Sequence, residues 1–184
     1  YGSVSVIYGS SNGLKTTGSQ LLTQGVDGVP GSSEEGDSFG SALAAGDFNG
    51  DSISDLAIGI PAEDFESWKT TIHNAGAVIV VYGTSQGLPG SGAQTFYEGL
   101  TCGRTGIPGE TQETDSFGAA LTTGDFNGDA MDDLAIGAPY DLSTAGTVTV
   151  IPGSALGGLQ CGRSRLWHQN VLDVEGTAEV SDRF

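Results

Sequence analysis

Two short segments of the sequence carry acidic and amide side chains at the spacing of a metal-binding loop. In the first, oxygen-bearing side chains occupy positions 1, 3, 5 and 9: Asp47, Asn49, Asp51 and Asp55. The second has the same residue types at the same spacing: Asp125, Asn127, Asp129 and Asp133. Odd spacing in a tight loop can turn alternate side chains towards one centre. Position 7, Ile53 or Met131, would then contribute its backbone carbonyl.

The donor set of these loops favours calcium. Every candidate ligand is a hard oxygen donor, and the three carboxylates give each loop a side-chain charge of −3. Such a set suits Ca²⁺ with its six to eight flexible ligands, whereas Mg²⁺ prefers a rigid octahedron with several waters. Softer metals prefer His or Cys. The sequence therefore predicts two Ca²⁺ sites, in loops 47–55 and 125–133.

Other acidic loops fit less well. An EF-hand needs Gly at position 6 and a bidentate Glu at position 12 between two helices. Position 6 is Ser52 or Ala130, position 12 is Ile58 or Ile136, and a strand-like run follows each loop. Dockerin-type loops continue into a helix and fail for the same reason. An Asp/Asn-rich hairpin turn without metal remains the alternative.

The acidic segments belong to a longer internal repeat. DSFGSALAAGDFNGDSISDLAIGIP begins at Asp37, and DSFGAALTTGDFNGDAMDDLAIGAP begins 78 residues later at Asp115. A second element recurs three times, as GSVSVIYGSSNGL from Gly2, GAVIVVYGTSQGL from Gly76 and GTVTVIPGSALGGL from Gly146. The chain holds about two and a half copies of a unit of roughly 70 to 78 residues, which indicates a repeat architecture.

Each unit is predicted to form four short strands. In the first complete unit they cover residues 39–47, 55–60, 77–82 and 94–98, with Gly and Pro clusters between them. No segment shows sustained helical periodicity, which argues against a βαβ fold. Four antiparallel strands per repeat predict an all-β fold made of β-propeller blades. A β-sandwich would explain the strands but not the length of the repeat.

The repeats divide the chain into four parts. Residues 1–36 are the third and fourth strands of a preceding blade with a connection, 37–114 a complete repeat, 115–181 a second repeat, and 182–184 the start of a third. Propellers close with about four to eight blades, so two and a half cannot form a ring. We expect either part of a longer propeller or a chain that completes its ring with other copies.

The composition restricts the classes of partner. The 184 residues include 23 acidic and 6 basic side chains, for a formal charge of −17. Such a surface repels nucleic acid and anionic membranes, and it suits bound cations or a soluble extracellular protein. The sequence has no apolar run long enough to span a membrane and no visible signal peptide.

The motifs around the loops resemble a known family. Phe117-Gly118 before the second loop and Gly137-Ala138-Pro139 after it look like the FG-GAP repeats of the integrin α-subunit propeller. The first copy has Phe39-Gly40 and Gly59-Ile60-Pro61, with Ile60 in place of alanine. In style the chain is more similar to bacterial, especially actinobacterial, secreted FG-GAP proteins.

The resemblance implies several further properties. It implies a seven-bladed propeller with calcium in the loop between the first and second strands of a blade. It also implies that these loops share one face, opposite the face that integrins use for ligands. The ligand-binding residues of integrins have no identifiable counterpart here, so no RGD-binding role is carried over.

Some features are reminiscent of an enzyme. The pattern G-x-S-x-G occurs at Gly9–Gly13 and Gly83–Gly87, but a nucleophile elbow needs a strand-to-helix turn with a His and an acid elsewhere. Here the pattern is predicted to lie between two strands, and the third copy has Ala155 instead of Ser. His168 aligns with Thr23 and Tyr97, a variable strand position. We therefore expect no catalytic activity.

The two cysteines, Cys102 and Cys161, each lie in a short insertion. Two cysteines in an acidic chain of secreted character favour a disulfide. However, Cys102 follows a fourth strand and Cys161 precedes one, which places them nominally at opposite faces. Bridged Cα atoms must come within about 7 Å. Both an intrachain bond and pairing with cysteines outside this chain remain open.

The resulting functional hypothesis is an extracellular, calcium-binding module for scaffolding, recognition or adhesion. Its partner would be an unidentified protein or glycan, and the best candidate contact is loop 62–74, with Phe65, Trp68 and His73. That loop could instead simply pack its own aromatic residues. Trp167 aligns with Leu22 and Phe96 and is expected in the core between blades. The alternatives are an accessory propeller of a secreted hydrolase such as a phospholipase, and a self-assembling chain.

Overall fold

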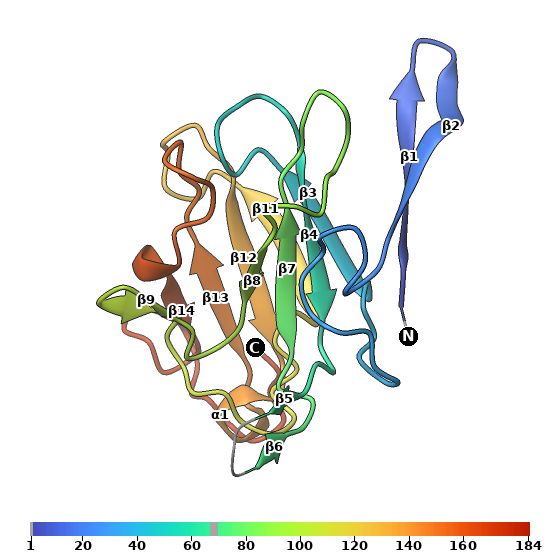
Figure 1. Cartoon of the computed structure of the whole chain (residues 1–184). Helices are drawn as coiled ribbons and strands as arrows, with labels where there is room; N and C mark the ends of the chain where they lie inside the picture. The colour runs from blue at the N-terminus through green and yellow to red at the C-terminus, as the bar shows by residue number, and fades with distance from the viewer. Residues whose placement is uncertain (1, 67–69) are drawn as a thin grey trace.

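The computed structural model describes residues 2–66 and 70–184, and Trp68 lies outside the described residues. Two four-stranded antiparallel sheets form its body (Figure 1). The first has the order β3-β4-β7-β8, with bounds Ala42–Gly46, Asp55–Ile60, Ala77–Val81 and Gln94–Phe96. The second has the order β11-β12-β13-β14, with bounds Ala120–Gly124, Asp133–Ala138, Thr147–Ile151 and Arg165–Trp167. Each sheet is a four-stranded meander, so the prediction of an all-β fold built from propeller blades is confirmed.

The strands begin and end close to the predicted bounds, with two differences, one of which is that β8 ends at Phe96 and not at residue 98. The first strand was expected from Phe39, but β3 begins at Ala42. The preceding residues form a turn in which the Ser41 amide donates to the Ser38 carbonyl (3.1 Å). Gly40 has φ +85°, outside the extended region. The turn lets the Phe39 side chain fold into the core instead of continuing the sheet.

The N-terminal hairpin repeats the pairing of the outer half of a sheet. β1 (Val4–Ser10) and β2 (Gly13–Leu22) pair in the register Val4↔Leu22. In the first sheet β7 and β8 pair in the register Val78↔Phe96, at the equivalent positions of the repeat. Figure 1 shows the tip of this hairpin projecting beyond the two sheets.

Several short elements lie outside the sheets. They are the pairs β5 (Phe65–Glu66) with β6 (Thr71–Ile72) and β9 (Thr101–Cys102) with β10 (Thr105–Gly106), the turn α1 (Asp141–Thr144) and the 3-10 turn η1 (Cys161–Arg163). Leu142 and Ser143 within α1 have positive φ, so this segment is a left-handed turn. No helix in the described part of the chain is long and apolar enough to cross a membrane.

Alternation along the strands buries both faces of the first sheet. Val78 and Val80 of β7 lie in a core shared with the second sheet. Ile79 and Val81 lie in a second core shared with the β1–β2 hairpin. Because successive side chains of a strand point to opposite faces, a strand covered on both sides reads as one continuous apolar run.

The Phe-Gly motif at the start of each repeat packs against the preceding strands of the chain. Phe117 is fully buried, and its amide donates to the Ala75 carbonyl (2.9 Å). The Gly118 amide donates to the Gly137 carbonyl within its own sheet (3.1 Å). A Cβ on Gly59 would lie 2.1 Å from the Gly118 carbonyl oxygen, so the sheets approach where both residues lack side chains. Gly at these positions therefore permits close packing.

Candidate metal loops and the sheet junctions

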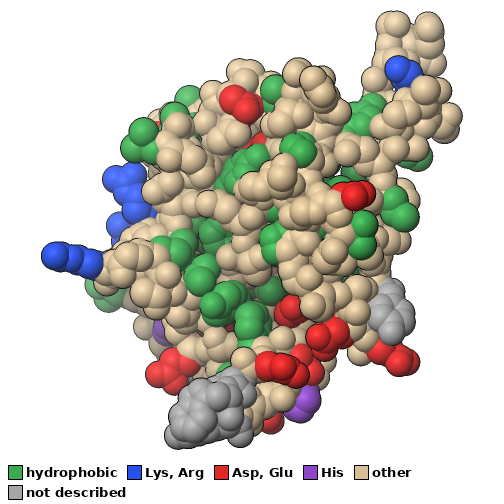
Figure 2. Space-filling view, in the orientation of Figure 1, with side chains coloured by type: hydrophobic (Ala, Val, Ile, Leu, Met, Phe, Trp, Pro, Cys, Tyr) green, Lys and Arg blue, Asp and Glu red, His purple; other side chains and the backbone are tan. Residues whose placement is uncertain are grey.

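The two acidic loops connect the first and second strands of their sheets, as the sequence predicted. The first connects β3 to β4, and the second connects β11 to β12. They lie next to each other: the Asp132 amide donates to the Asp47 carbonyl (3.0 Å), and the Asp132 carboxylate accepts from the Asp47 amide (2.9 Å). Both loops therefore lie at one end of the body. Figure 1 shows β5 and β6 at the other end, and Figure 2 shows acidic side chains gathering there.

In the first loop the carboxylates hold the backbone in a tight turn. Asp47 accepts from the amides of Asp51 (3.0 Å) and Ser52 (2.8 Å). The Asn49 side-chain oxygen also accepts from the Asp51 amide (2.9 Å). Asp51 in turn accepts from the Ile53 amide (2.8 Å). Ser52 has φ +67°, which completes the reversal of the chain.

The second loop shares most of these hydrogen bonds, but its Asn127 side-chain amide donates to the Asp133 carboxylate (3.0 and 3.2 Å). Asp125 accepts from the amides of Gly128 (2.7 Å), Asp129 (3.0 Å) and Ala130 (2.9 Å). These amides, that of Ala130 above all, lower the Asp125 pKa. Ala130 has φ +67°, like Ser52. The repeated conformation follows from the repeated Asp and Asn spacing, because their side chains bond to nearby backbone amides.

The last predicted ligand of each loop is buried at the start of the second strand. Asp55 accepts from the amides of Phe48 (3.0 Å) and Gly83 (2.8 Å). Burial raises the Asp55 pKa to about 6, although these two amides oppose the increase. Asp133 accepts from the equivalent amides of Phe126 (3.0 Å) and Gly153 (2.9 Å). Each carboxylate thus connects its loop to the turn after the third strand.

The composition of the loops fits a calcium ion. Over residues 2–66 and 70–184 the one ion pair is His73–Asp64, so no described basic side chain neutralises either loop. The carbonyl oxygens of Ile53 and Met131 accept no hydrogen bond from a described residue. Side-chain oxygens at positions 1, 3, 5 and 9 and this carbonyl would hold the ion. Bound calcium would offset the charge and stiffen the hairpin, since carboxylates have lone pairs beyond those used by the amides.

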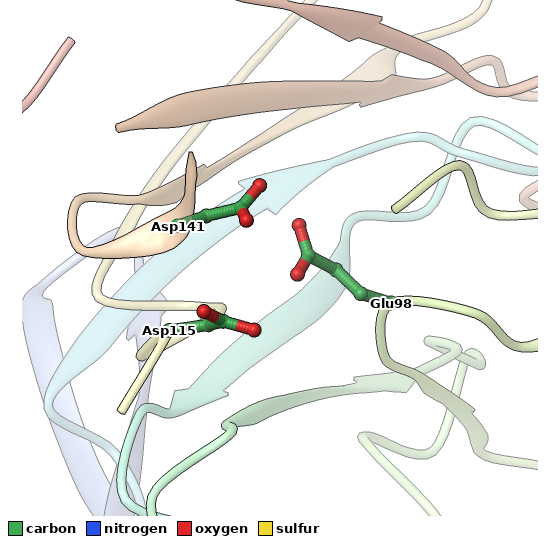
Figure 3. A group of neighbouring side chains, drawn as sticks. All are labelled: Glu98, Asp115 and Asp141. Atoms are coloured by element: carbon green, nitrogen blue, oxygen red, sulfur yellow. The ribbon is translucent and has the colours of Figure 1, made fainter. Parts of the chain in front are cut away.

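The acidic side chains that lie closest together are not those of the two loops. Within the described part of the chain, the three carboxylates with ligand atoms inside 4.8 Å of one another are Glu98, Asp115 and Asp141, so those of either loop lie further apart (Figure 3). Sequence reasoning missed this group because its members come from three separate segments. Alignment of the repeats offered a signal, since Asp115 and Asp141 are matched by the acids Asp37 and Glu63 in the preceding repeat.

The cysteines are joined to each other. Cys102 and Cys161 form a disulfide with a Cα–Cα distance of 6.0 Å. The inference that they lie at opposite faces is therefore wrong. The β9–β10 hairpin packs on η1, where the Thr105 hydroxyl donates to the Gly162 carbonyl (2.9 Å) and the Ser164 hydroxyl to the Gly106 carbonyl (3.2 Å). The insertion after β8 thus brings Cys102 to the segment that precedes β14.

Trp167 does not lie in a core between sheets, contrary to expectation. Leu22 and Phe96 are 4% and 2% exposed, whereas Trp167 is 40% exposed. It lines an open groove of about 700 Å³ together with Phe126 and Arg165. Trp167 has the same position in the repeat as Leu22 and Phe96, but no described segment covers this face of the second sheet.

The features that suggested an enzyme lie in strand connections. Ser11 lies in the exposed turn between β1 and β2, and Ser85 in the exposed turn that follows β7. Neither turn leads into a helix. In the predicted contact loop, the Phe65 ring packs at a tilt of 42° against Tyr97 with ring centroids 4.5 Å apart, and His73 contacts Asp64 (2.7 Å).

The comparisons with known proteins agree with this architecture. Residues 39–81 and 117–151 match the FG-GAP repeat family. The chain is 34% identical over 139 residues to bovine phosphatidylinositol-glycan-specific phospholipase D, covering 76% of this chain and 15% of that protein. It is 36% identical over 126 residues to integrin alpha-PS2 of Drosophila melanogaster, covering 67% of this chain and 8% of the integrin.

A third relative is integrin alpha-4 of Xenopus laevis, 32% identical over 161 residues, covering 79% of this chain and 14% of the integrin. The chain thus spans a small part of each relative. In each repeat, a matched segment contains the acidic loop, the strands on either side of it and the third strand. The chain therefore carries two FG-GAP repeats, related to those of integrin α-subunits and phosphatidylinositol-glycan-specific phospholipase D.

Proposed function

We propose that this chain is a calcium-stabilised β-propeller module that presents a recognition or adhesion surface outside the cell and performs no catalysis itself. One observation carries the calcium part: two loops with the same oxygen donors carry uncompensated carboxylates at the same place in both FG-GAP repeats. Without a cation, the carboxylates of one loop repel one another at close range.

The extracellular setting has separate support. The disulfide between Cys102 and Cys161 is of a kind that persists in oxidising compartments. The excess of acidic over basic side chains also suits a soluble protein in a medium rich in calcium. The relatives that carry similar repeats include integrin α-subunits, which supports a role in adhesion.

The role of calcium is tested by thermal unfolding with and without a chelator. An ion that binds the folded state alone stabilises it by about 2.7 kcal/mol at a hundredfold excess over Kd. Chelation should lower the Tm, and the double variant Asp47→Ala with Asp125→Ala should have a lower Tm that no longer responds to chelator.

The matched control is Glu35→Ala with Glu113→Ala, which removes two exposed acids outside the loops and changes the net charge equally. This control should keep the full response to the chelator. An unaltered chain whose Tm is the same in chelator and in calcium would refute the proposed role of the ion.

The partner is proposed to be a protein or glycan, together with further blades. The uncovered face of the second sheet, with Phe126 and Trp167, supports the docking of another blade or another copy of the chain. Mass measurement of the native particle separates a monomer from a self-assembled ring. Calcium-dependent retention on immobilised extracellular proteins or glycans would support recognition, and calcium-independent retention would contradict it.

The match to phosphatidylinositol-glycan-specific phospholipase D favours a second candidate, an accessory propeller of a secreted hydrolase. The sequence of the complete precursor decides between the two. A catalytic domain beside the repeats would support the accessory role, and adhesion modules in that place would support the first proposal.

A further inference from the structure

Three acidic side chains meet in the interior where the two four-stranded sheets join (Figure 3). Glu98 follows β8, Asp115 lies in the segment that leads to β11, and Asp141 begins the turn after β12. They are 2%, 3% and 2% exposed. Burial of an unpaired charged carboxylate is unfavourable, so such a group requires a cation, a hydrogen-bond donor or a proton.

The described residues supply little of this compensation. Asp115 accepts from the Gln112 amide (2.8 Å), and one oxygen of Asp141 accepts from the Leu142 amide (2.6 Å). Both oxygens of Glu98 and the second oxygen of Asp141 are buried without a hydrogen-bond partner. No described basic side chain pairs with any of the three. The Glu98 carboxylate points into the group (Figure 3) and accepts no hydrogen bond from a described residue.

The preceding junction shows how the fold fills this place without a third acid. There the equivalent residues are Gln24, Asp37 and Glu63. The Gln24 amide donates to Glu63 (2.9 Å), and the environment is again buried, since Gln24 is 2% exposed. At the junction between the two four-stranded sheets Glu98 stands in place of this Gln, which removes the side-chain amide donor and adds a negative charge.

We propose that Glu98, Asp115 and Asp141 bind a divalent cation, calcium, at the junction between the two sheets. The donor set consists of carboxylate oxygens alone, which selects a hard cation. Three carboxylates that bind through one or both oxygens suit the variable coordination of calcium. Magnesium would need several waters in a regular octahedron, for which a buried site is less suitable.

The Gly109 backbone packs closely against the Glu98 carboxylate. Gly109 has φ +100°, and a Cβ at this position would lie 3.1 Å from the Glu98 carboxyl carbon. A residue with a side chain would press on the carboxylate. Burial, followed by the charges of Asp141 and Asp115, raises the Glu98 pKa to about 9. A proton is therefore the competing occupant, and the experiment must distinguish it from calcium.

The experiment counts bound calcium ions on the folded chain by native mass spectrometry at pH 8, with equilibrium dialysis as a second measure. The variant Glu98→Gln places at this junction the residue that the preceding junction uses. It should fold and should bind one calcium ion fewer than the unaltered chain. Asp141→Asn should lose the same ion, which covers the case in which one variant does not fold.

The loop variant Asp47→Ala with Asp125→Ala separates this proposal from the proposed function. It should still bind one ion, and adding Glu98→Gln to it should remove that ion. A loop variant that binds no calcium, or a Glu98→Gln chain with the same ion count as the unaltered chain, would overturn the junction site. If the loops do not bind calcium but the junction does, the loop variant will bind the same number of ions as the unaltered chain.

Thermal unfolding gives an independent readout. In chelator Glu98→Gln should have at least the Tm of the unaltered chain, because the free Glu98 holds a proton and Gln replaces one neutral side chain by another of the same size. Calcium should raise the Tm of the unaltered chain by more than that of the variant. Equal calcium responses in the two chains would show that a proton fills the site and would refute the proposal.

Discussion

The two acidic loops have the same side chains at the ligand positions but different surroundings. Phe48, the second residue of the first loop, is fully buried in the core between the sheets, whereas Phe126 at the same place is 54% exposed. The first loop also rests on Asp132 of the second loop, while no described segment lies against Phe126 in the same way. A repeat therefore sets the conformation of a loop, but the next sheet sets its environment.

The largest expected difference between the loops comes from their phenylalanines. Phe48→Ala should destabilise the protein by about 3–5 kcal/mol, because it removes a large buried side chain and leaves a cavity. Phe126→Ala should change stability by less than about 1 kcal/mol, since much of that side chain is already exposed. Urea unfolding of both variants measures the difference. Equal losses would show that the two environments are alike in solution.

The disulfide provides a second contrast, between the two junctions. It joins the first sheet to the second across 59 residues, and the described residues contain no such link to the β1–β2 hairpin. Replacing both cysteines by Ser should cost about 2–4 kcal/mol, largely by freeing the unfolded chain. Calorimetry of the double variant tests this. A Tm unaffected by the loss of the bond would contradict the contribution.

A smaller effect is expected from the contact between the loops. Asp132→Ala leaves the Asp47 amide without its acceptor and should cost about 1–3 kcal/mol. Ser54, at the equivalent position of the first loop, is exposed and is the matched control. Ser54→Ala should stay within about 0.5 kcal/mol of the unaltered chain. Chemical denaturation of both variants gives the comparison, and similar values would count against a specific contact.

The smallest effect on stability is expected from the pair of His73 and Asp64. The pair lies in the segment between the second and third strands, which is longer in the first repeat than in the second. The hydrogen bond that His73 donates to the Asp64 carboxylate, and then the charge of Asp64, raises the His73 pKa above the ordinary value of 6.5. Because the folded pKa is raised, the stabilising contribution is complete below about pH 6.5 and is lost as the pH rises through the raised pKa. NMR titration should find this midpoint, and Asp64→Asn should lower it towards 6.5. A His73 midpoint that is the same in the Asp64→Asn variant would show that the two side chains do not interact in solution.

Much of the fold could be predicted from local patterns. The continuous apolar run Ala77–Val81, the Gly and Pro punctuation and the 78-residue offset of the repeat indicate four strands per unit. The loop positions also followed, because short-range Asp and Asn bonding to nearby amides recurs wherever the spacing recurs. The calcium ligands and the number of blades in a complete ring stay predictions.

The remaining features depend on contacts between distant segments. Cys102 and Cys161 meet because the β9–β10 hairpin folds onto η1, a packing that strand order alone does not reveal. The repeat alignment likewise places Trp167 with buried Leu22 and Phe96, yet exposure depends on whether another sheet covers that face.

The sequence by itself determined the repeat, the strands and the chemistry of the two loops, since these depend on spacing within a few residues. Only the tertiary structure decided that Phe48 is buried while Phe126 is exposed, and that the cysteines pair. It also brought Glu98, Asp115 and Asp141 together from three segments. The physical reason is that burial and charge compensation belong to the junction between sheets, where segments far apart in the chain supply each other's surroundings.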